Sequence, residues 1–184
     1  MRTITAFLAV VFLAGCGSSP KTNFYTLSVA PARTGHASIS APVQLAAVHI
    51  PPSLDRRQMV RLTNANSVAI SETDRWSAPF DEMVRSVLSQ DLAAQWPNGM
   101  VVLPQAPAPP GTRPLVVTIA QFGPDAGGTV RLSGSWALVD GTSGVVRREH
   151  NFEFDAGPAE NASATAAAMS QALGRLSTAI SAAL

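Results

Sequence analysis

Residues 115–138 read LVVTIAQFGPDAGGTVRLSGSWAL, and this stretch decides the fold. Its first eight residues are mostly β-branched or apolar, which favours a strand. After a turn at 124–128, apolar and small or polar residues alternate from Val130 to Leu138, as in a strand with one buried face. A second turn at Asp140–Gly144 precedes a third run, from Val146 to Phe154. The pattern predicts a meander of three antiparallel strands.

Helical periodicity flanks this meander on both sides. Residues 79–96 carry apolar side chains at three- and four-residue spacing, and Asp81 and Glu82 follow Pro79 where acidic residues favour a helix start. Residues 160–184 are rich in alanine and predict a closing helix with one apolar stripe. We therefore predict an α+β fold, in which an antiparallel β-sheet has two helices packed on one face.

Shorter apolar runs upstream predict the remaining strands. They lie at residues 24–27, 43–50, 59–62, 68–70 and 100–103. The run 43–50 is apolar on both faces, which indicates a central strand, and Asn64–Ser67 predicts a hairpin turn between the next two runs. Residues 104–114 contain five prolines and predict an extended loop.

The start of the chain has the features of an export signal. Arg2 precedes a short apolar run that ends in Leu13-Ala14-Gly15-Cys16, and the run is too short to span a bilayer. Leu-Ala-Gly-Cys resembles the lipobox of bacterial lipoproteins. The resemblance implies that residues 1–15 are removed and that Cys16 becomes the new N-terminus, carrying a diacylglycerol and an N-acyl chain. The alternative is a buried cysteine in an ordinary signal or core helix.

The remaining chain would consist of a small, polar tether at 16–23 and one folded domain at 24–184. Gly17 resembles the outer-membrane sorting pattern, which implies an anchor on the outer membrane facing the periplasm. Without residues 1–15, twelve basic side chains balance twelve acidic ones, so we expect no nucleic-acid partner and no polybasic membrane patch. Cys16 is the only cysteine, which excludes a disulfide framework and a cysteine–zinc site. We expect no cofactor apart from the covalent lipid.

Several motifs resemble the ABC-type transport auxiliary lipoproteins of the PqiC/YmbA kind. They are Phe24–Leu27, the stretch IPPSLDRRQMV at 50–60, and ETDRWSAPF at 72–80 leading into a helix. The strand around Leu132–Trp136 and the alanine-rich terminal helix also fit. Ser53 and Ala78 depart from the family pattern, where an aromatic and an acidic residue are common.

This resemblance implies an auxiliary role in envelope lipid transport. The partners would be a bridging MCE-domain protein and an associated inner-membrane permease and ATPase, and the lipoprotein would dock the bridging protein or accept lipid cargo. The chain lacks the Gly-x-x-x-x-Gly-Lys motif of an ATPase. Assembly into a homo-oligomer is compatible with this role, but no sequence feature establishes it.

Two polar segments are candidate partner-binding sites. Asp55 and Arg56, followed by Arg57, come directly after a strand-stopping Pro-Pro, and they either contact a partner or form a solvated turn. Arg75 and Trp76 precede the first helix. Arginine and tryptophan are favoured interface anchors, but Trp76 could equally pack under the helix start.

Two other function classes stay open. One is a stand-alone lipid-binding or envelope-assembly lipoprotein with an apolar pocket between sheet and helices. The other is a periplasmic hydrolase, for which His36, His49 and His150 lack metal-ligand spacing and Ser133-Gly134-Ser135 lies within a predicted strand. We expect no enzymatic activity.

Overall fold

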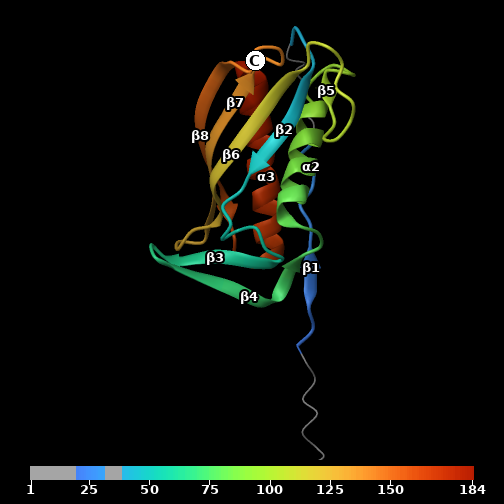
Figure 1. Cartoon of the computed structure of the whole chain (residues 1–184). Helices are drawn as coiled ribbons and strands as arrows, with labels where there is room; N and C mark the ends of the chain where they lie inside the picture. Colours follow the sequence, from blue (N-terminus) through green and yellow to red (C-terminus); the bar gives the residue numbers. More distant parts are fainter. Residues whose placement is uncertain (1–19, 32–38) are drawn as a thin grey trace, which may run out of the picture.

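A computed structural model describes residues 20–31 and 39–184 of the chain. Its elements in chain order are β1 (Asn23–Tyr25), β2 (Val43–His49), β3 (Gln58–Asn64), β4 (Ser67–Trp76), α2 (Phe80–Ala93), β5 (Val101–Val102), β6 (Arg113–Pro124), β7 (Thr129–Val139), β8 (Val146–Pro158) and α3 (Ala162–Ala183). Two helices and two mixed sheets confirm the α+β class (Figure 1).

The larger sheet has five strands in the order β5-β2-β6-β7-β8. The predicted antiparallel meander forms its β6-β7-β8 part, with Val117 opposite Trp136 and Trp136 opposite His150. β2 is an internal strand, as predicted, but it pairs in parallel with both β5 and β6. The sheet is therefore mixed: the predicted antiparallel pairing holds for β6, β7 and β8, and the pairs of β2 depart from it. A long crossover, which includes a hairpin and α2, connects β2 to β6 and allows parallel pairing.

A second sheet of three strands, in the order β1-β4-β3, was not predicted. The predicted hairpin is its β3–β4 part, and β4 extends to Trp76, beyond the predicted end at Ile70. β1 pairs in parallel with the end of β4, with Asn23 opposite Asp74 and Tyr25 opposite Trp76. Figure 1 places this small sheet at one end of the molecule and the C-terminus at the other.

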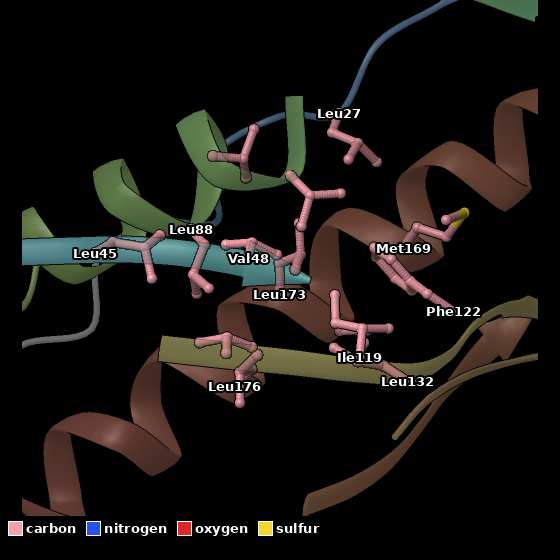
Figure 2. Close-up of a cluster of buried hydrophobic side chains, with 14 of the residues drawn as sticks. Leu27, Leu45, Val48, Leu88, Ile119, Phe122, Leu132, Met169, Leu173 and Leu176 are labelled. Atoms are coloured by element: carbon pink, nitrogen blue, oxygen red, sulfur yellow. The ribbon is translucent and has the colours of Figure 1, made fainter. Parts of the chain in front are cut away.

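Both helices pack against the larger sheet around one core (Figure 2). Val84 and Leu88 of α2 and Leu173 and Leu176 of α3 are completely buried, as are Leu115, Val117 and Leu132 of the sheet. α2 ends at Ala93, three residues before the predicted end, and Trp96 remains buried in the following turn. α3 begins after Asn161, whose side chain accepts a hydrogen bond of 2.9 Å from the Ala164 backbone.

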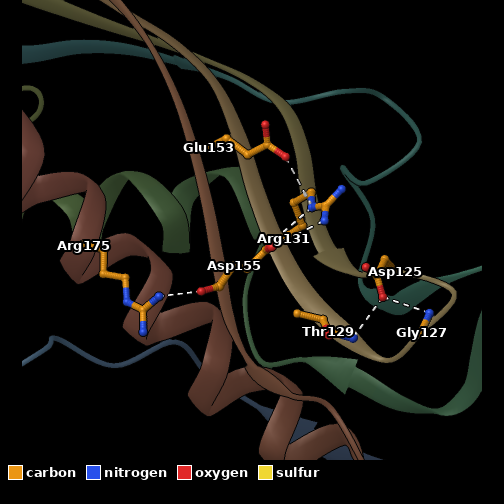
Figure 3. A network of polar contacts seen from close by, with 7 residues as sticks. All are labelled: Asp125, Gly127, Thr129, Arg131, Glu153, Asp155 and Arg175. Carbon is orange, nitrogen blue, oxygen red and sulfur yellow. Dashed lines mark hydrogen bonds and ion pairs between the residues drawn. The ribbon is translucent and has the colours of Figure 1, made fainter.

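Polar contacts hold the outer face and the turn of the meander (Figure 3). Asp125 accepts hydrogen bonds from the backbone N–H groups of Gly127 and Thr129, which closes the β6–β7 turn. Arg131 on β7 donates to Asp155 on β8 at 2.8 Å, and this bond lowers the pKa of the Asp155 carboxyl group. These bonds connect neighbouring strands on the face away from the helices.

Candidate partner-binding site

The loop that contains Asp55, Arg56 and Arg57 is a tight turn beside the small sheet. The backbone N–H groups of Leu54 and Asp55 donate to the Pro51 carbonyl at 2.9 and 3.2 Å, and Arg56 N–H donates to the Leu54 carbonyl at 2.8 Å. Leu54 packs against the core, whereas Asp55 is exposed. The turn therefore directs polar side chains outwards and fixes the loop through one apolar residue.

The two predicted candidate segments meet in the structure. The backbone N–H of Trp76 donates to the Arg57 carbonyl at 2.7 Å, and Gln58 pairs with Arg75 in the β3–β4 ladder. The next residue, Ser77, donates to the Tyr25 carbonyl of β1 at 2.8 Å. The loop, β1 and the start of α2 thus converge at one point.

Trp76 belongs to the core. Its side chain is 3% exposed, and its ring stacks on Phe80 with 5.1 Å between centroids, while Phe80 contacts Phe122 at 5.7 Å. A ring that is almost completely buried cannot act as a surface anchor for a partner. The interpretation of Trp76 as an interface anchor is corrected here in favour of the alternative, packing under the helix start.

Arg56 and Arg75 lie at the edge of this core. Both side chains are half-buried, and the Nε atom of each is buried without a hydrogen-bond partner among the described residues. Within residues 20–31 and 39–184, neither guanidinium group forms an ion pair with an acidic side chain. Partly desolvated and unpaired positive charges can bind a partner carboxylate or carbonyl group.

An apolar groove of about 270 Å³ opens between this loop, the hairpin and the end of β6. Leu54, Leu62, Val68 and Phe122 line it, together with Pro51, Ser53, Val60, Arg61, Ala120, Gln121, Gly123 and Pro124. Gly123 has φ of +149°, a backbone conformation that favours glycine, at the point where β6 approaches the Val60 carbonyl. We refer to this feature as the hairpin groove. Its apolar lining includes Leu54, the residue directly before the polar Asp55–Arg57 turn.

A polar cluster that the sequence analysis missed joins β1 to β4. Asp74 accepts hydrogen bonds from the Asn23 side chain and the Tyr25 hydroxyl group at 3.2 Å each, and from the Ser71 hydroxyl group at 3.0 Å. Burial, followed by the Asp74 charge and hydrogen bond, raises the pKa of Tyr25. The cluster fastens the short β1 strand, and no sequence spacing connects residues 50 positions apart in this way.

A second acidic residue was also missed because it lies within a helix. Asp91 of α2 is 2% exposed and accepts a hydrogen bond of 2.8 Å from the Ala30 backbone, while its Oδ2 atom has no partner among the described residues. Burial raises its pKa to about 6, and the Ala30 hydrogen bond opposes this shift. Asp91 borders a surface groove of about 420 Å³ between α2 and α3, near the buried Gln95–Ser177 hydrogen bond.

The other candidate residues are dispersed. Cys16 and His36 lie outside the described residues. His49 is exposed at the end of β2, His150 stacks on Trp136 on β8, and Ser133-Gly134-Ser135 lies within β7. Within residues 20–31 and 39–184, no group of three His, Cys, Asp or Glu side chains could hold a metal ion. In the same ranges, no helix has the length and hydropathy of a membrane span.

Comparison with protein families gives one match that covers most of the chain. Residues 25–181 match the model of the ABC-type transport auxiliary lipoprotein component. Two characterised relatives, each called intermembrane transport lipoprotein PqiC, come from Escherichia coli K12 and Shigella flexneri. Each is 30% identical over 141 residues, which are 75% of this chain and 74% of the relative.

Solved structures share the fold. One crystal structure of an uncharacterised protein superposes with a TM-score of 0.72 over 89% of this chain and 99% of its own, at 20% identity. A crystal structure of a Xanthomonas campestris protein superposes with a TM-score of 0.66 over 86% of this chain and 92% of its own, at 16% identity. At these identities the likeness concerns the fold alone.

Proposed function

The chain belongs to the ABC-type transport auxiliary lipoprotein family, and on this premise we propose that it is a lipid-anchored auxiliary subunit of an MCE/ABC-type envelope lipid transport system. Cys16 carries the lipid, and the domain faces the periplasm from the outer membrane. The domain docks a bridging MCE-domain protein, which is linked to an inner-membrane permease and ATPase. Intermembrane transport is the role named for the PqiC relatives.

The observation that carries this proposal is the contrast between a filled interior and an open apolar groove. Side chains with no exposed surface, such as Leu88, Leu115 and Leu173, fill the space between the sheet and the helices. A stand-alone lipid carrier would need a pocket there. The hairpin groove lies on the surface and offers Leu62 and Val68 to an apolar segment of another protein.

The polar turn beside the groove supplies the polar contacts of this docking site. Asp55 and Arg57 are exposed on the turn that follows Leu54 of the groove. Among the described residues, the guanidinium groups of Arg56 and Arg75 form no ion pair with an acidic side chain. A buried apolar anchor surrounded by charged rim residues is the usual anatomy of a protein interface. Trp76 contributes by fixing the loop to the core.

The lipid anchor makes docking efficient. A domain held at the membrane by its first residue meets a membrane-spanning assembly in two dimensions, which raises the effective concentration of both partners. Stable anchoring requires more than one acyl chain, which the diacylglycerol and the N-acyl chain of a lipoprotein would supply.

Co-purification tests the proposal. The mature protein is isolated from gently solubilised membranes, its intact mass is measured, and retained proteins are identified by mass spectrometry, with Cys16→Ala as control. We expect a mass increment for the lipid and recovery of an MCE-domain protein with its permease. An unmodified Cys16 would contradict the anchor, and bound lipid without a protein partner would favour the stand-alone lipid-binding class.

A further inference from the structure

The geometry points to the small sheet as a second membrane contact: we propose that β1 and the β3–β4 hairpin rest on the phospholipid surface that holds the anchor. This inference rests on the proposed lipid at Cys16. Beyond the anchor, the inference assigns the folded domain a membrane-facing surface, the small sheet. The ligand of this surface is the anionic phospholipid headgroup layer.

The reach of the chain limits where the small sheet can lie. Seven residue steps separate Cys16 from Asn23, the first residue of β1. A fully extended chain spans at most ~3.6 Å per residue, so β1 begins within about 25 Å of a lipidated Cys16. Figure 1 shows β1 and the hairpin at the same end of the molecule. The small sheet is therefore the part of the domain held near the bilayer.

The small sheet exposes apolar side chains that the core does not use. Phe24 on β1 is 61% exposed, and Val68 and Ile70 on β4 are 51% and 45% exposed. Val68 and its cross-strand neighbour Leu62 line the hairpin groove, whereas Phe24 and Ile70 lie outside that lining. An exposed aromatic residue beside the tether and an exposed isoleucine on the hairpin suit the boundary between headgroups and acyl chains.

Basic residues are slightly in excess in the small-sheet segments although the whole chain is nearly neutral. Residues 20–31 and 51–77 carry Lys21, Arg56, Arg57, Arg61 and Arg75 against Asp55, Glu72 and Asp74, a formal charge of +2. Residues 39–50 carry no charged residue apart from His49, and residues 78–184 carry six arginines against nine acidic residues, a formal charge of −3. The basic residues of the small-sheet segments can contact anionic headgroups, although Glu160 of the second set borders the hairpin at the same end.

Two contacts would orient the domain, whereas a single tether leaves it free to rotate. With the small sheet on the lipid surface, the C-terminal end of α3 points away from the membrane. The hairpin groove then opens between the hairpin and β6, beside the membrane. A bridging protein that reaches the outer membrane would find the groove at a fixed height and orientation.

Fluorescence quenching in vesicles tests this contact. The lipidated protein is reconstituted in vesicles of phosphatidylethanolamine, phosphatidylglycerol and a nitroxide-labelled phosphatidylcholine. A fluorophore is attached to Ala65→Cys in the hairpin turn or, as control, to Thr142→Cys in the β7–β8 turn; the thiol of Cys16 is consumed by the lipid. We expect the nitroxide lipid to quench the hairpin fluorophore and to leave the control fluorophore unquenched.

A matched pair of variants isolates the apolar face. Phe24→Ser with Ile70→Ser, two exposed residues outside the groove lining, should abolish the quenching at the hairpin turn. Val145→Ser with Val146→Ser, where two valines are 54% and 51% exposed at the other end of the sheet, should preserve it. Replacing phosphatidylglycerol by phosphatidylcholine should reduce the quenching, because the attraction of the basic residues is lost.

The outcomes separate the contact from the anchor. An intact mass without lipid would overturn the anchor and the inference with it. A lipidated protein whose two fluorophores are equally unquenched would overturn the membrane contact and leave the anchor intact. If the hairpin fluorophore became buried only after a protein partner bound, the membrane contact would also be overturned. The hairpin face would then be assigned to that partner.

Discussion

The backbone N–H of Trp76 donates a hydrogen bond of 2.7 Å to the carbonyl oxygen of Arg57. This bond joins the polar turn beside the hairpin groove to the residue whose ring packs under α2. The exposed turn is consequently held by the core, so damage to the core at Trp76 should disturb the turn as well. A binding defect of a Trp76 variant is informative only when its folding is measured too.

Trp76→Ala should lower the free energy of unfolding by about 3–5 kcal/mol, because it leaves a large cavity beside Phe80. Urea unfolding followed by circular dichroism measures this loss. Trp76→Phe, which keeps an aromatic ring against Phe80, should lose less. If Trp76→Ala were as stable as the wild type and lost only partner binding, Trp76 would be an interface residue after all.

Gly134→Ala should be strongly destabilising. A Cβ atom at this position of β7 would lie 2.0 Å from the Thr118 carbonyl oxygen of β6, so the backbone of the central sheet would have to shift. We expect a loss of about 3 kcal/mol or more in the free energy of unfolding. Gly157→Ala on β8 is the control, because its Cβ would meet no atom within 4 Å. Equal stability of both variants would refute the close approach of β6 and β7.

Asp91→Asn should stabilise the protein at neutral pH. The folded-state pKa of about 6 lies above the unfolded value of 3.8, so folding binds protons between these values. The contribution of the Asp91 carboxyl group to the free energy of unfolding is therefore fully present at low pH and is lost as the pH rises through 6. Asparagine keeps the acceptor for the Ala30 N–H and removes the buried charge. We expect the free energy of unfolding to rise by about 2 kcal/mol at pH 7.5 and this gain to disappear near pH 4. The difference of about two units between the folded-state and unfolded-state pKa values sets the upper limit of the gain.

Urea unfolding of both proteins across this pH range measures the effect. Glu82→Gln, an exposed position on the same helix, is the control and should show no comparable gain. A gain for Asp91→Asn that stays constant from pH 4 to 7.5 would contradict a buried carboxyl group that titrates near pH 6.

Asp74→Ala should loosen β1 without unfolding the domain. It removes the acceptor of the Asn23, Tyr25 and Ser71 side chains, while the core residues below are untouched. We expect amide hydrogen exchange of β1 to accelerate by about thirtyfold, since the two lost bonds to β1 are worth ~1 kcal/mol each. Glu72→Ala, at an exposed position on the same strand, should leave this exchange unchanged. Identical exchange in both variants would mean that backbone pairing alone holds β1.

The meander could be predicted because its information is local. The turns at 124–128 and 140–144 connect adjacent strands, and the alternation in β7 identifies its buried face. The parallel partners of β1 and β2 could not be predicted in this way. β2 and β6 are separated by a hairpin, a helix and a short strand, and no periodicity within either strand encodes its neighbour.

The candidate site could be predicted only in part, because its segments are distant in the sequence. Sequence motifs indicated the Asp55–Arg57 and Arg75–Trp76 segments separately, and only the β3–β4 ladder brings them together. A tryptophan next to an arginine fits both an interface and a core, so the residue types left the burial of Trp76 open. The groove depends on the approach of β6 at Gly123 to the Val60 carbonyl, a contact between distant segments.

Partner capture by the hairpin groove is the central claim, and one comparison tests it most directly. The lipidated wild type, Leu62→Asp in the groove and Leu103→Asp at an exposed position away from the groove are purified side by side from membranes, and the retained MCE-domain protein is quantified. Since a buried charge without a partner is costly, we expect Leu62→Asp to lose most of the partner at unchanged folding and lipidation, and Leu103→Asp to retain it. Equal retention by all three proteins would contradict docking in the groove.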